Sequence, residues 1–246
     1  MIEWNRKKLL AFLFPPKCIG CGELLSIDEG AEEIFCPFCR TAWEAGRLTA
    51  VDGGLSGSNA ECISLVKYRS GETEGVPEKL IYHIKHHDEG RVFDYIACEL
   101  TSLMRQAYAS AVLDEGQILL SYPPRSRKAL RKDGFDQARR LAKAVSVRTG
   151  FPVASLLLRV GKKEKEQKYL SAEKRKANAM TSYRLRKGVD VRGKVICLFD
   201  DVYTTGATLK SCAGLLTDAG ASQVLFVTVG KTVRSVDVKP QETQKL

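Results

Sequence analysis

The chain has 246 residues, which is enough to bury a full core and allows one large domain or two unequal ones. Hydrophobic residues make up 44% of the chain and charged residues 28%, a composition typical of soluble globular proteins. No apolar run approaches the ~20 residues that a membrane-spanning helix needs, so we expect no membrane insertion.

The net charge of +10 is distributed unevenly along the chain. Residues 125–194 contain 22 Lys or Arg against 6 Asp or Glu, whereas the rest of the chain is net acidic. This basic belt would attract a pyrophosphate group and also nucleic acid, so charge alone does not choose between these ligands.

The N-terminus has some features of a signal peptide. Three basic residues at positions 6–8 precede an apolar run at positions 9–14, which a Pro-Pro pair ends. The run is short and no small-residue cleavage site follows it. We therefore expect a short helix that packs on its neighbour, in a cytoplasmic protein.

Two C-x2-C pairs with fourteen intervening residues come next: Cys18, Cys21, Cys36 and Cys39. Gly22 follows the first pair and Pro37 lies within the second, so both pairs can form tight turns that present two thiolates to one ion. Four thiolates at this spacing predict a structural Zn²⁺ site without an open coordination position. Disulfides are the competing interpretation, but nothing in the sequence indicates an oxidising compartment. Redox chemistry, or cysteines that bind no metal, would also be compatible with this spacing.

Residues 46–60 are rich in glycine and serine, which predicts a loop at a domain boundary. Apolar and polar side chains alternate loosely over residues 62–68, which suits an edge strand. Helices are expected over residues 78–87 and 95–109.

The histidines and the remaining cysteines could also bind metals, but we interpret both groups as structural. The chain's histidines, His83, His86 and His87, have helical spacing and could form a metal-binding face. We favour a solvated helix end instead. The cysteines outside the two pairs (Cys62, Cys98, Cys197 and Cys212) lie in apolar surroundings, and we interpret them as small buried hydrophobic residues.

A second strand is expected over residues 118–122, ended by Pro123 and Pro124. Basic side chains crowd the exit of this strand, before a helix over residues 135–148: Arg125, Arg127, Lys128, Arg131 and Lys132. A strand that leads into a basic loop and then a helix could bind the pyrophosphate half of a phosphorylated donor. A solvated basic turn is the alternative.

Residues 153–158 suit a further strand. The following segment, Arg159 to Ala179, is strongly charged and has no apolar periodicity, so we expect a mobile loop or lid; the alternative is an exposed helix. Residues from Lys231 onward lose apolar content, and we expect this tail to fray.

Residues 195–208 are the most informative stretch. Five apolar residues that end on Asp200 and Asp201 predict a buried parallel strand. A Thr-Thr-Gly turn leads into a helix over residues 207–219, and another strand over residues 224–229 follows.

Loop amides, a helix N-terminus and threonine hydroxyls suit a phosphate, and Gly206 allows a ligand to approach the backbone. The two carboxylates suit sugar hydroxyls or Mg²⁺. Together, these features indicate a site for ribose 5-phosphate.

This stretch resembles the phosphoribosyl-pyrophosphate (PRPP) signature of type I phosphoribosyltransferases. The resemblance implies that Asp200 and Asp201 hold the ribose hydroxyls and that the loop wraps the 5-phosphate. The loop residues concerned are Tyr203, Thr204, Thr205, Gly206, Ala207 and Thr208. An acidic strand end before an N-capped helix, without a ligand, is the structural alternative.

The order of motifs along nearly the whole chain is similar to that of the ComF family of bacterial competence and DNA-utilisation proteins. That family joins a four-cysteine zinc module to a phosphoribosyltransferase domain. The matching positions beyond the cysteines and the PRPP signature are Lys85, Pro123, Pro124, Gly134, Phe135, Gln137, Leu141, Ala142, Arg159, Gln167, Leu170, Arg175 and Asn178. The fold that this resemblance implies is α/β, with a type I phosphoribosyltransferase-like parallel sheet flanked by helices and a small N-terminal zinc module. The expected divisions are residues 1–50 for the N-terminal helix and zinc module, 51–232 for the transferase-like domain and 233–246 for a flexible tail.

The sequence departs from the family pattern at two places. The usual Arg-Gly-Phe-Asn-Gln reads Asp133-Gly134-Phe135-Asp136-Gln137 here, so acids replace an arginine and an asparagine. The strand exit reads Tyr-Pro-Pro-Arg at residues 122–125, where the family tends to have Val-Pro-Leu-His or similar. Both changes affect the pyrophosphate loop and leave the ribose phosphate residues unchanged.

The resemblance implies attack of a nucleophile on C1 of PRPP, departure of pyrophosphate, and Mg²⁺ bound with the donor. Asp200, Asp201 and Arg175 would be catalytic, and Arg125 and Lys128 would join the loop in binding substrate. Residues 51–117 are expected to help build the acceptor site.

The alternative function is a non-catalytic module of DNA uptake that senses PRPP or a nucleotide, or that binds DNA. Its partners would be single-stranded DNA or competence proteins such as a DNA-uptake helicase.

Overall fold

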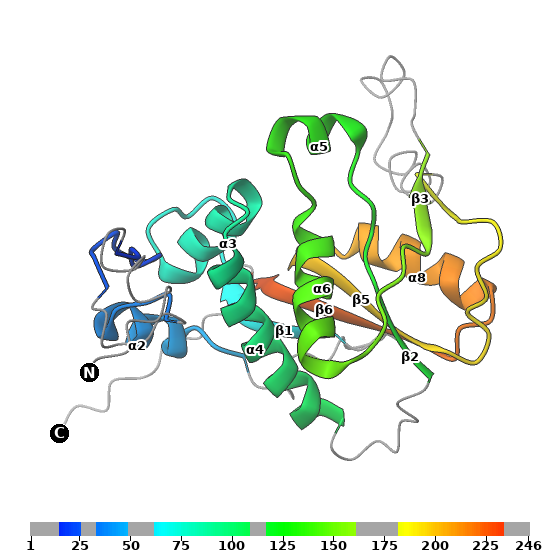
Figure 1. The fold of residues 1–246 in the computed structure, drawn as a ribbon, viewed down its shortest axis with the longest axis horizontal. Coiled ribbons are helices and arrows are strands. Elements are labelled where there is room, and N and C mark those ends of the chain that lie inside the picture. The colour runs from blue at the N-terminus through cyan, green and yellow to red at the C-terminus, as the bar shows by residue number, and fades with distance from the viewer. Residues whose placement is uncertain (1–14, 26–32, 49–61, 109–116, 161–181, 234–246) are drawn as a thin grey trace, which may run out of the picture.

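A computed structural model describes residues 15–25, 33–48, 62–108, 117–160 and 182–233 (Figure 1). The predicted N-terminal helix at residues 9–14 and nearly all of the predicted lid and tail lie outside the described residues. Within the described ranges, no helix is both long and apolar enough to cross a bilayer.

A four-stranded parallel sheet forms the centre of the molecule, with strand order β1-β6-β5-β2. The strands are β1 (Cys62–Tyr68), β2 (Ile118–Ser121), β5 (Val195–Tyr203) and β6 (Gln223–Thr232). All four strands were predicted, including the edge position of β1. The observed β6 is longer than predicted at both ends, because it pairs with β5 on one side and β1 on the other.

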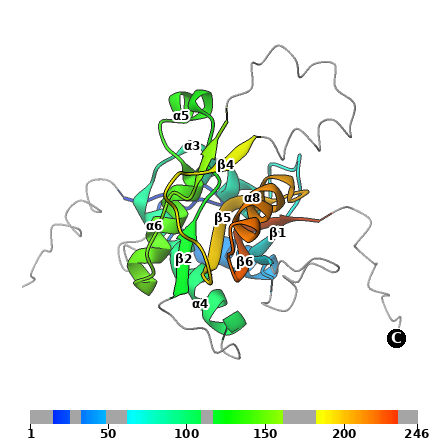
Figure 2. The ribbon, with the colours of Figure 1, turned by 90° about the vertical axis from the view of Figure 1, so that its right-hand side faces the viewer.

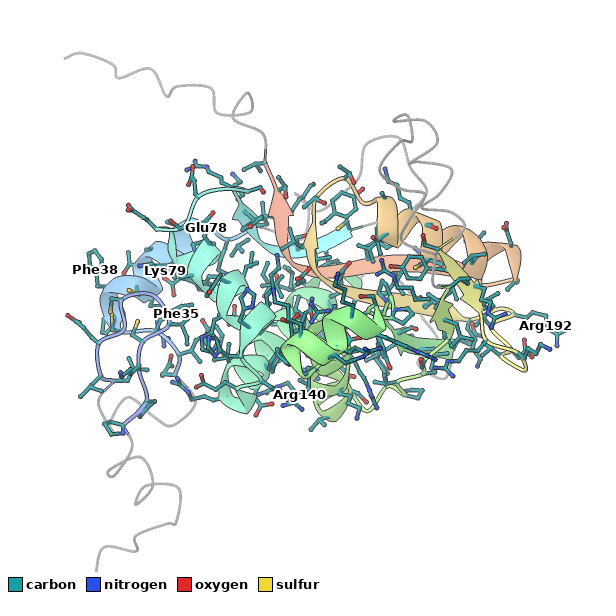
Figure 3. The ribbon with its side chains drawn as sticks, turned by 90° about the horizontal axis from the view of Figure 1, so that it is seen from above. Phe35, Phe38, Glu78, Lys79, Arg140 and Arg192 are labelled. Carbon is teal, nitrogen blue, oxygen red and sulfur yellow. The ribbon has the colours of Figure 1, made fainter. Side chains whose placement is uncertain are left out.

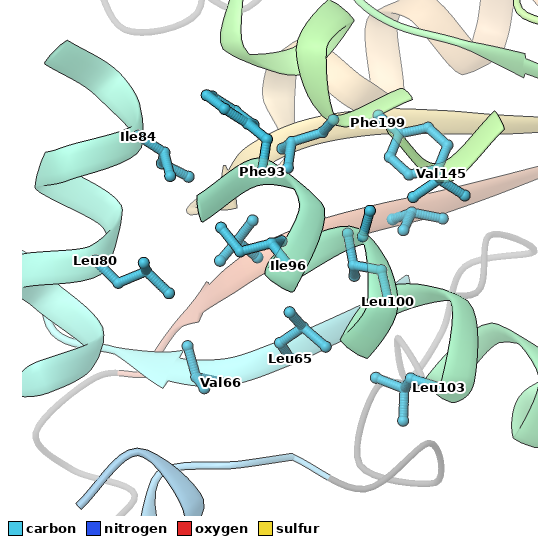
Figure 4. Packing of buried hydrophobic residues seen from close by; sticks show 14 of the residues in the cluster. Leu65, Val66, Leu80, Ile84, Phe93, Ile96, Leu100, Leu103, Val145 and Phe199 are labelled. Atoms are coloured by element: carbon cyan, nitrogen blue, oxygen red, sulfur yellow. The ribbon is translucent and has the colours of Figure 1, made fainter. Parts of the chain in front are cut away.

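Helices cover both faces of the sheet (Figure 2). In β5, Val195, Cys197 and Phe199 belong to a hydrophobic cluster that includes side chains of α3 (Val76–His86), α4 (Gly90–Tyr108) and α6 (Gln137–Thr149). Ile196 and Leu198 belong to a second cluster with α8 (Ala207–Asp218). This division follows the alternation of side chains along a strand, and it explains why β5 is apolar at every position before its acids. Figure 4 shows the first cluster.

The predicted helices that fall within the described residues are confirmed, with small changes at their ends. α4 begins five residues before the predicted Tyr95, because Val92 and Phe93 already pack into the core. α6 begins after Asp136, whose carboxylate accepts a hydrogen bond from the Arg139 amide and caps the helix.

The basic segment after β2 is not only a loop, as predicted, but contains the short helix α5 (Arg127–Asp133). The Ser126 hydroxyl caps its first turn, and Gly134 ends it in the left-handed conformation, with φ of 78°. The helix has no buried residue, so it carries no apolar periodicity by which it could be recognised. Its capping residues were the only local signal.

The predicted strand over residues 153–158 is wrong in its extent. Val153 makes only an isolated parallel bridge to Leu120 at the edge of the main sheet. The chain then forms β3 (Leu157–Arg159), which pairs antiparallel with β4 (Tyr183–Leu185). These two short strands enclose the predicted lid, of which residues 161–181 lie outside the described ranges.

The N-terminal module contains α2 (Pro37–Ala45) and lies beside α3 at one end of the molecule (Figure 1). Its residues Phe35 and Trp43 belong to the same hydrophobic cluster as the main domain. After α2, Arg47 bridges antiparallel to Val66, and the Leu48 amide donates to the Leu65 carbonyl at 2.8 Å. The module therefore covers part of the exposed edge of β1.

Three of the four cysteines interpreted as buried hydrophobic residues are buried: Cys62, Cys197 and Cys212. Cys98 is exposed, so that interpretation is wrong for this residue. It lies on the solvent side of α4, between the core residues Ala97 and Leu100.

Candidate active site

The acidic pair lies where β5 leaves the sheet. The Asp200 carboxylate accepts a hydrogen bond from the Asp201 amide at 2.9 Å, and the Asp201 carboxylate accepts one from the Val202 amide at 2.7 Å. The backbone therefore fixes one oxygen of each carboxylate. Ligands of open α/β sheets bind outside the carboxyl ends of the strands, which is the position of this pair.

Two side chains from other elements hold the second oxygen of Asp201. Gln137 Nε2, at the first turn of α6, donates to Asp201 Oδ2 at 3.1 Å. Lys85 Nζ, from the last turn of α3, lies 3.7 Å from the same oxygen. Neither residue was among the predicted site residues. Both are positions that match the ComF family, and this match was the signal that could have identified them.

Gln137 has a second feature that points to a ligand. Its side chain is buried, and its Oε1 atom has no hydrogen-bond partner among the described residues. A buried amide oxygen without a donor is costly, and a ligand hydroxyl or an ordered water would remove this cost.

Burial raises the pKa of Asp200, and the neighbouring Asp201 carboxylate raises it further, to about 8. Two carboxylates this close do not ionise together readily unless a cation or hydrogen-bond donors approach them. The pair is therefore suited to bind a divalent cation or sugar hydroxyls.

The predicted phosphate loop connects β5 to α8. Gly206 has φ of 68°, and a β-carbon at this position would collide with the Tyr203 ring. The Tyr203 side chain is buried and stacks on Phe226, with ring centroids 6.2 Å apart, so it supports the loop from below. Thr204 and Thr205 are exposed above it, and the Thr205 hydroxyl oxygen accepts a hydrogen bond from the Ala207 amide at 3.4 Å.

The loop ends at the N-terminus of α8, where Ala207 is the first helical residue and Thr208 is partly exposed. Free amides and the helix dipole favour an anion at this end. The geometry is thus compatible with phosphate next to the acid pair.

A further cation lies near this helix end. Arg159, the last residue of β3, donates to the Tyr183 hydroxyl at 3.3 Å, and its guanidinium lies 5.6 Å from the centroid of the Tyr183 ring. Burial raises the pKa of Tyr183, whose hydroxyl also interacts with Thr208. Arg159, another position of the family match, is therefore linked through Tyr183 to the predicted phosphate loop.

On the other side of the acid pair, Arg125 is already paired. Its guanidinium donates to the Asp133 carboxylate at 2.7 Å and to the Phe135 carbonyl at 3.2 Å, while its amide donates to Asp136. The two acids by which this chain departs from the ComF pattern thus hold the segment after β2 in its folded form. Lys128 is exposed on α5, and Arg175 lies outside the described residues.

The four N-terminal cysteines converge as predicted. The sulfur atoms of Cys18, Cys21, Cys36 and Cys39 all lie within 4.8 Å of one another, and all eight cysteines of the chain are free thiols. Cys21 Sγ and Cys36 Sγ are 3.7 Å apart. Tetrahedral zinc with Zn–S bonds of ~2.3 Å requires sulfurs roughly 3.8 Å apart, so this set of donors fits Zn²⁺. The cluster can hold a metal ion, and its four ligands leave no open position.

Local structure explains this convergence. Gly22 turns with φ of 80°, and its amide donates to the Cys18 carbonyl at 2.8 Å. Gly20 approaches Cys39 so closely that a β-carbon would lie 2.6 Å from its sulfur. The Cys36 amide donates to Cys18 Sγ at 3.3 Å, which joins the two pairs.

The main domain holds this module through two long cationic side chains. Lys79 Nζ, on α3, donates to the Gly20 carbonyl at 2.8 Å. Arg91, on α4, donates to the carbonyls of Lys17 and Glu33. Figure 3 shows Lys79 beside the module.

The histidines are not metal ligands in this arrangement. His83 Nε2 lies 2.9 Å from Glu89 Oε2, and the rings of His83 and His87 stack with centroids 4.6 Å apart. Among the described residues, the cysteine quartet is the only group of three or more Cys, His, Asp or Glu side chains that lie close enough to hold one metal ion.

No protein-family model matches the chain. Among curated proteins, the chain is similar to the competence protein ComFC of Streptococcus pneumoniae (strain ATCC BAA-255 / R6), with 30% identity over 129 residues. The match covers 50% of this chain and 54% of that protein, so it spans about half the length of the curated relative. This similarity confirms the predicted resemblance to the ComF family.

Solved structures with some likeness to the chain include the following three enzymes. The phosphoribosylpyrophosphate synthetase of Mycobacterium smegmatis is 20% identical, with a TM-score of 0.34 over 55% of this chain and 33% of that one. The glutamine PRPP amidotransferase of B. subtilis is 17% identical, with a TM-score of 0.39 over 60% and 30%. The adenine phosphoribosyltransferase of Leishmania tarentolae is 15% identical, with a TM-score of 0.37 over 72% and 93%. The α/β class rests instead on the parallel strand order and on the helices that cover both faces of the sheet.

Proposed function

We propose that this chain is a phosphoribosyltransferase-like protein that binds PRPP at the carboxyl end of β5 and transfers its phosphoribosyl group to an acceptor. The observation that carries the proposal is the partly buried arrangement around Asp201. Lys85 and Gln137 from two helices fix one carboxylate oxygen, and Gln137 Oε1 has no donor among the described residues. A ribose hydroxyl would supply that donor.

The protein has groups that match each end of the ribose phosphate. The Thr204–Thr208 loop and the N-terminus of α8 offer amides and hydroxyls to the 5-phosphate. Asp200 and Asp201 accept hydrogen bonds from the ribose hydroxyls. Arg159 and the side chains of α5 supply positive charge for the pyrophosphate, together with Arg175 from the lid.

Two metal ions belong to this proposal. Asp200 and Asp201 have the hard oxygen ligands that Mg²⁺ prefers, and Mg²⁺ bound with PRPP would neutralise donor charge. The cysteine quartet would hold structural Zn²⁺. The residues of the chain would orient the ribose and stabilise the oxocarbenium-like transition state as pyrophosphate leaves.

The biological setting that we propose is DNA uptake in the cytoplasm, which rests on the similarity to ComFC. In this setting, the basic belt could contact single-stranded DNA, and a DNA-uptake helicase is a candidate partner. Residues 1–50 would act as the zinc module and residues 51–232 as the transferase-like domain.

The experiment that tests the proposal measures PRPP binding and pyrophosphate release for wild type and Asp201→Asn in the presence of Mg²⁺, across a panel of bases and amines. We expect Asp201→Asn to weaken PRPP binding at least about tenfold and to abolish pyrophosphate release, because it removes charge from the position that the ribose and metal require. Asp218→Asn, an exposed acid at the other end of α8, is the matched control. Equal PRPP binding by wild type and Asp201→Asn would contradict the proposal.

A second candidate function is PRPP sensing without turnover, and the Arg125–Asp133 pair favours it. This pair neutralises a cation that a transferase could use to stabilise the departing pyrophosphate. Tight PRPP binding that depends on Asp201, without pyrophosphate release from any member of the panel, would select the sensor over the enzyme. DNA affinity that falls steeply with salt and is unaffected by Asp201→Asn would indicate a separate basic surface.

A further inference from the structure

The short strands β3 and β4 bring an arginine and a tyrosine together beside α8. Arg159 lies directly opposite Tyr183 in this antiparallel pair. At the next position, the Val160 amide donates to the Ser182 carbonyl at 2.8 Å. Hydrogen-bonded and non-hydrogen-bonded pairs alternate along an antiparallel ladder, so Arg159 and Tyr183 form a non-hydrogen-bonded pair. The side chains of such a pair approach each other most closely.

The two side chains make two contacts across this pair. The Arg159 guanidinium donates to the Tyr183 hydroxyl oxygen at 3.3 Å and also lies 5.6 Å from the centroid of the Tyr183 ring. One contact engages the hydroxyl and the other engages the ring face, so together they fix the direction in which the hydroxyl points. Only 8% of Tyr183 is exposed, so bulk water has little access to these contacts.

The tyrosine also faces α8, the helix that follows the predicted phosphate loop. β4 lies against this helix (Figure 2). Tyr183 shares a hydrophobic cluster with Leu209 and Cys212 of α8, and its hydroxyl interacts with the Thr208 side chain. Thr208 and Cys212 are four residues apart and therefore lie on the same face of the helix. Tyr183 thus packs on the helix face that carries Thr208, the second residue of α8.

The number of hydroxyl protons gives this set of contacts a direction. A tyrosine or threonine hydroxyl has one proton to donate. Because the Tyr183 oxygen accepts from Arg159, the Tyr183 proton is available to the Thr208 oxygen. The Thr208 hydroxyl then directs its own proton away from Tyr183, towards the exposed side of this partly exposed residue. The first turn of α8 presents backbone amides at the same end of the helix.

Arg159 also changes the electrostatic potential at this helix end. Burial raises the pKa values of Tyr183 and Cys212, the Asp200 carboxylate raises both further, and the Arg159 guanidinium lowers both. The negative potential of Asp200 would oppose a phosphate that binds nearby. Arg159 therefore offsets this potential while it holds Tyr183 in place.

We infer that Tyr183 is a positioning residue: held by Arg159, it orients the Thr208 hydroxyl as a donor to the phosphate on the sugar of a bound ligand. The inference rests on the proposed function, to which it adds a residue outside the stretch 195–208 that carries the PRPP resemblance. The phosphate end of the site would then depend on the β3–β4 pair as well as on its own loop.

The test measures binding of ribose 5-phosphate and of PRPP with Mg²⁺ to the full chain by calorimetry. We expect Tyr183→Phe to weaken ribose 5-phosphate binding about five- to tenfold, because a hydrogen bond to a charged phosphate loses its orientation. Tyr95→Phe is the matched control and should bind within about twofold of wild type. Tyr95 is a half-buried tyrosine of α4 that packs edge-on against Phe35, with ring centroids 5.7 Å apart.

A double-mutant cycle separates positioning from a purely structural role. Thr208→Val removes the hydroxyl and keeps the shape of the side chain, and we expect it to weaken ribose 5-phosphate binding at least about tenfold. The double variant should bind within about twofold of Thr208→Val, because Tyr183 acts through the hydroxyl that is already absent. A tyrosine that only supports the fold would instead give effects that multiply in the double variant.

Arg159→Met gives a second measurement that leaves the buried tyrosine ring unaltered. It removes the donor to Tyr183, and we expect it to weaken ribose 5-phosphate binding at least about threefold. Unchanged ribose 5-phosphate affinity in Tyr183→Phe or in Arg159→Met, or effects of Tyr183→Phe and Thr208→Val that multiply, would overturn the inference. Failure of wild type to bind PRPP or ribose 5-phosphate would instead refute the proposed function.

Discussion

The Arg125 guanidinium donates a 2.7 Å hydrogen bond to Asp133, whose side chain is only 9% exposed. This pair holds the start and the end of the α5 segment together. It also neutralises a cation that, under the proposed function, would otherwise face the pyrophosphate of the donor. The acid at position 133 therefore stabilises the local fold at the expense of positive potential near the site.

Asp133→Asn should increase the affinity for inorganic pyrophosphate by about three- to tenfold in the presence of Mg²⁺, because it frees the charge of Arg125 and keeps the shape of the side chain. Arg125 would remain in place through its hydrogen bonds to Phe135 and Asp136. Isothermal titration calorimetry measures the change. Asp190→Asn is the control, since it removes the exposed pair with Arg192, which lies at the opposite end of the molecule from the N-terminal module (Figure 3). Unchanged or weaker pyrophosphate binding in Asp133→Asn would show that Arg125 does not face the ligand.

Gly206→Ala should destabilise the protein by about 1–3 kcal/mol and weaken PRPP binding, because alanine is unfavourable at φ of 68° and its β-carbon would collide with Tyr203. Urea unfolding measures the stability change. The same helix provides the opposite control: Gly214 is exposed, with no atom within 4 Å of an added β-carbon. Gly214→Ala should stabilise the protein by about 0.5–1 kcal/mol and leave PRPP binding unchanged. Equal effects of the two substitutions would contradict this account of the loop.

The strands and the acid pair were predictable because β5 and its loop form one contiguous segment with a strong apolar pattern. The partners of Asp201 were not predictable from pattern alone. Gln137 is 64 positions away in sequence, and only the packing of α6 on the sheet brings it to the acids. The bounds of β3 and the presence of β4 could not be predicted, because strands of three residues carry too little alternation to be recognised.

The cysteine quartet was predictable from spacing, but its connection to the main core was not. Cys18, Cys39 and Trp43 share one hydrophobic cluster with Leu80 and Phe93, so the module packs as part of the larger domain. Sequence composition suggested a boundary near residue 50, and the contacts that cross it come from side chains such as Lys79 and Arg91.

Removal of the metal should therefore affect the whole domain. We expect one zinc ion per chain by elemental analysis, and a decrease in Tm of at least about 5 °C after chelation or in Cys39→Ser. The reason is that loss of the metal loosens thiols that are buried in the shared cluster. Cys98→Ser, which changes an exposed thiol on α4, should retain the zinc and shift Tm by less than about 2 °C. A chelated protein with unchanged Tm would show that the quartet does not support the fold.

The raised pKa of Asp200 predicts opposite effects of pH on stability and on ligand binding. Burial and the Asp201 carboxylate raise this pKa to about 8, above its unfolded value of roughly 3.9. The folded protein therefore binds the proton more tightly than the unfolded chain does. The contribution of Asp200 to stability is fully present below about pH 4 and is lost as the pH rises through about 8. Mg²⁺ requires the ionised carboxylate, so the affinity for Mg²⁺ and PRPP should increase over the same interval.

Urea unfolding and PRPP calorimetry between pH 6 and 9 measure both effects. Asp200→Asn should remove the Asp200 component of each pH dependence. The dependence that remains in the variant comes from the other titratable groups of the protein and, in the binding measurement, also from PRPP itself. In the wild type, Mg²⁺ with PRPP should offset the loss of stability at high pH, because these ligands stabilise the ionised pair. If Asp200→Asn and wild type followed the same pH dependence in both measurements, the proton would not reside on Asp200. The acid pair would then bind its ligands without releasing a proton.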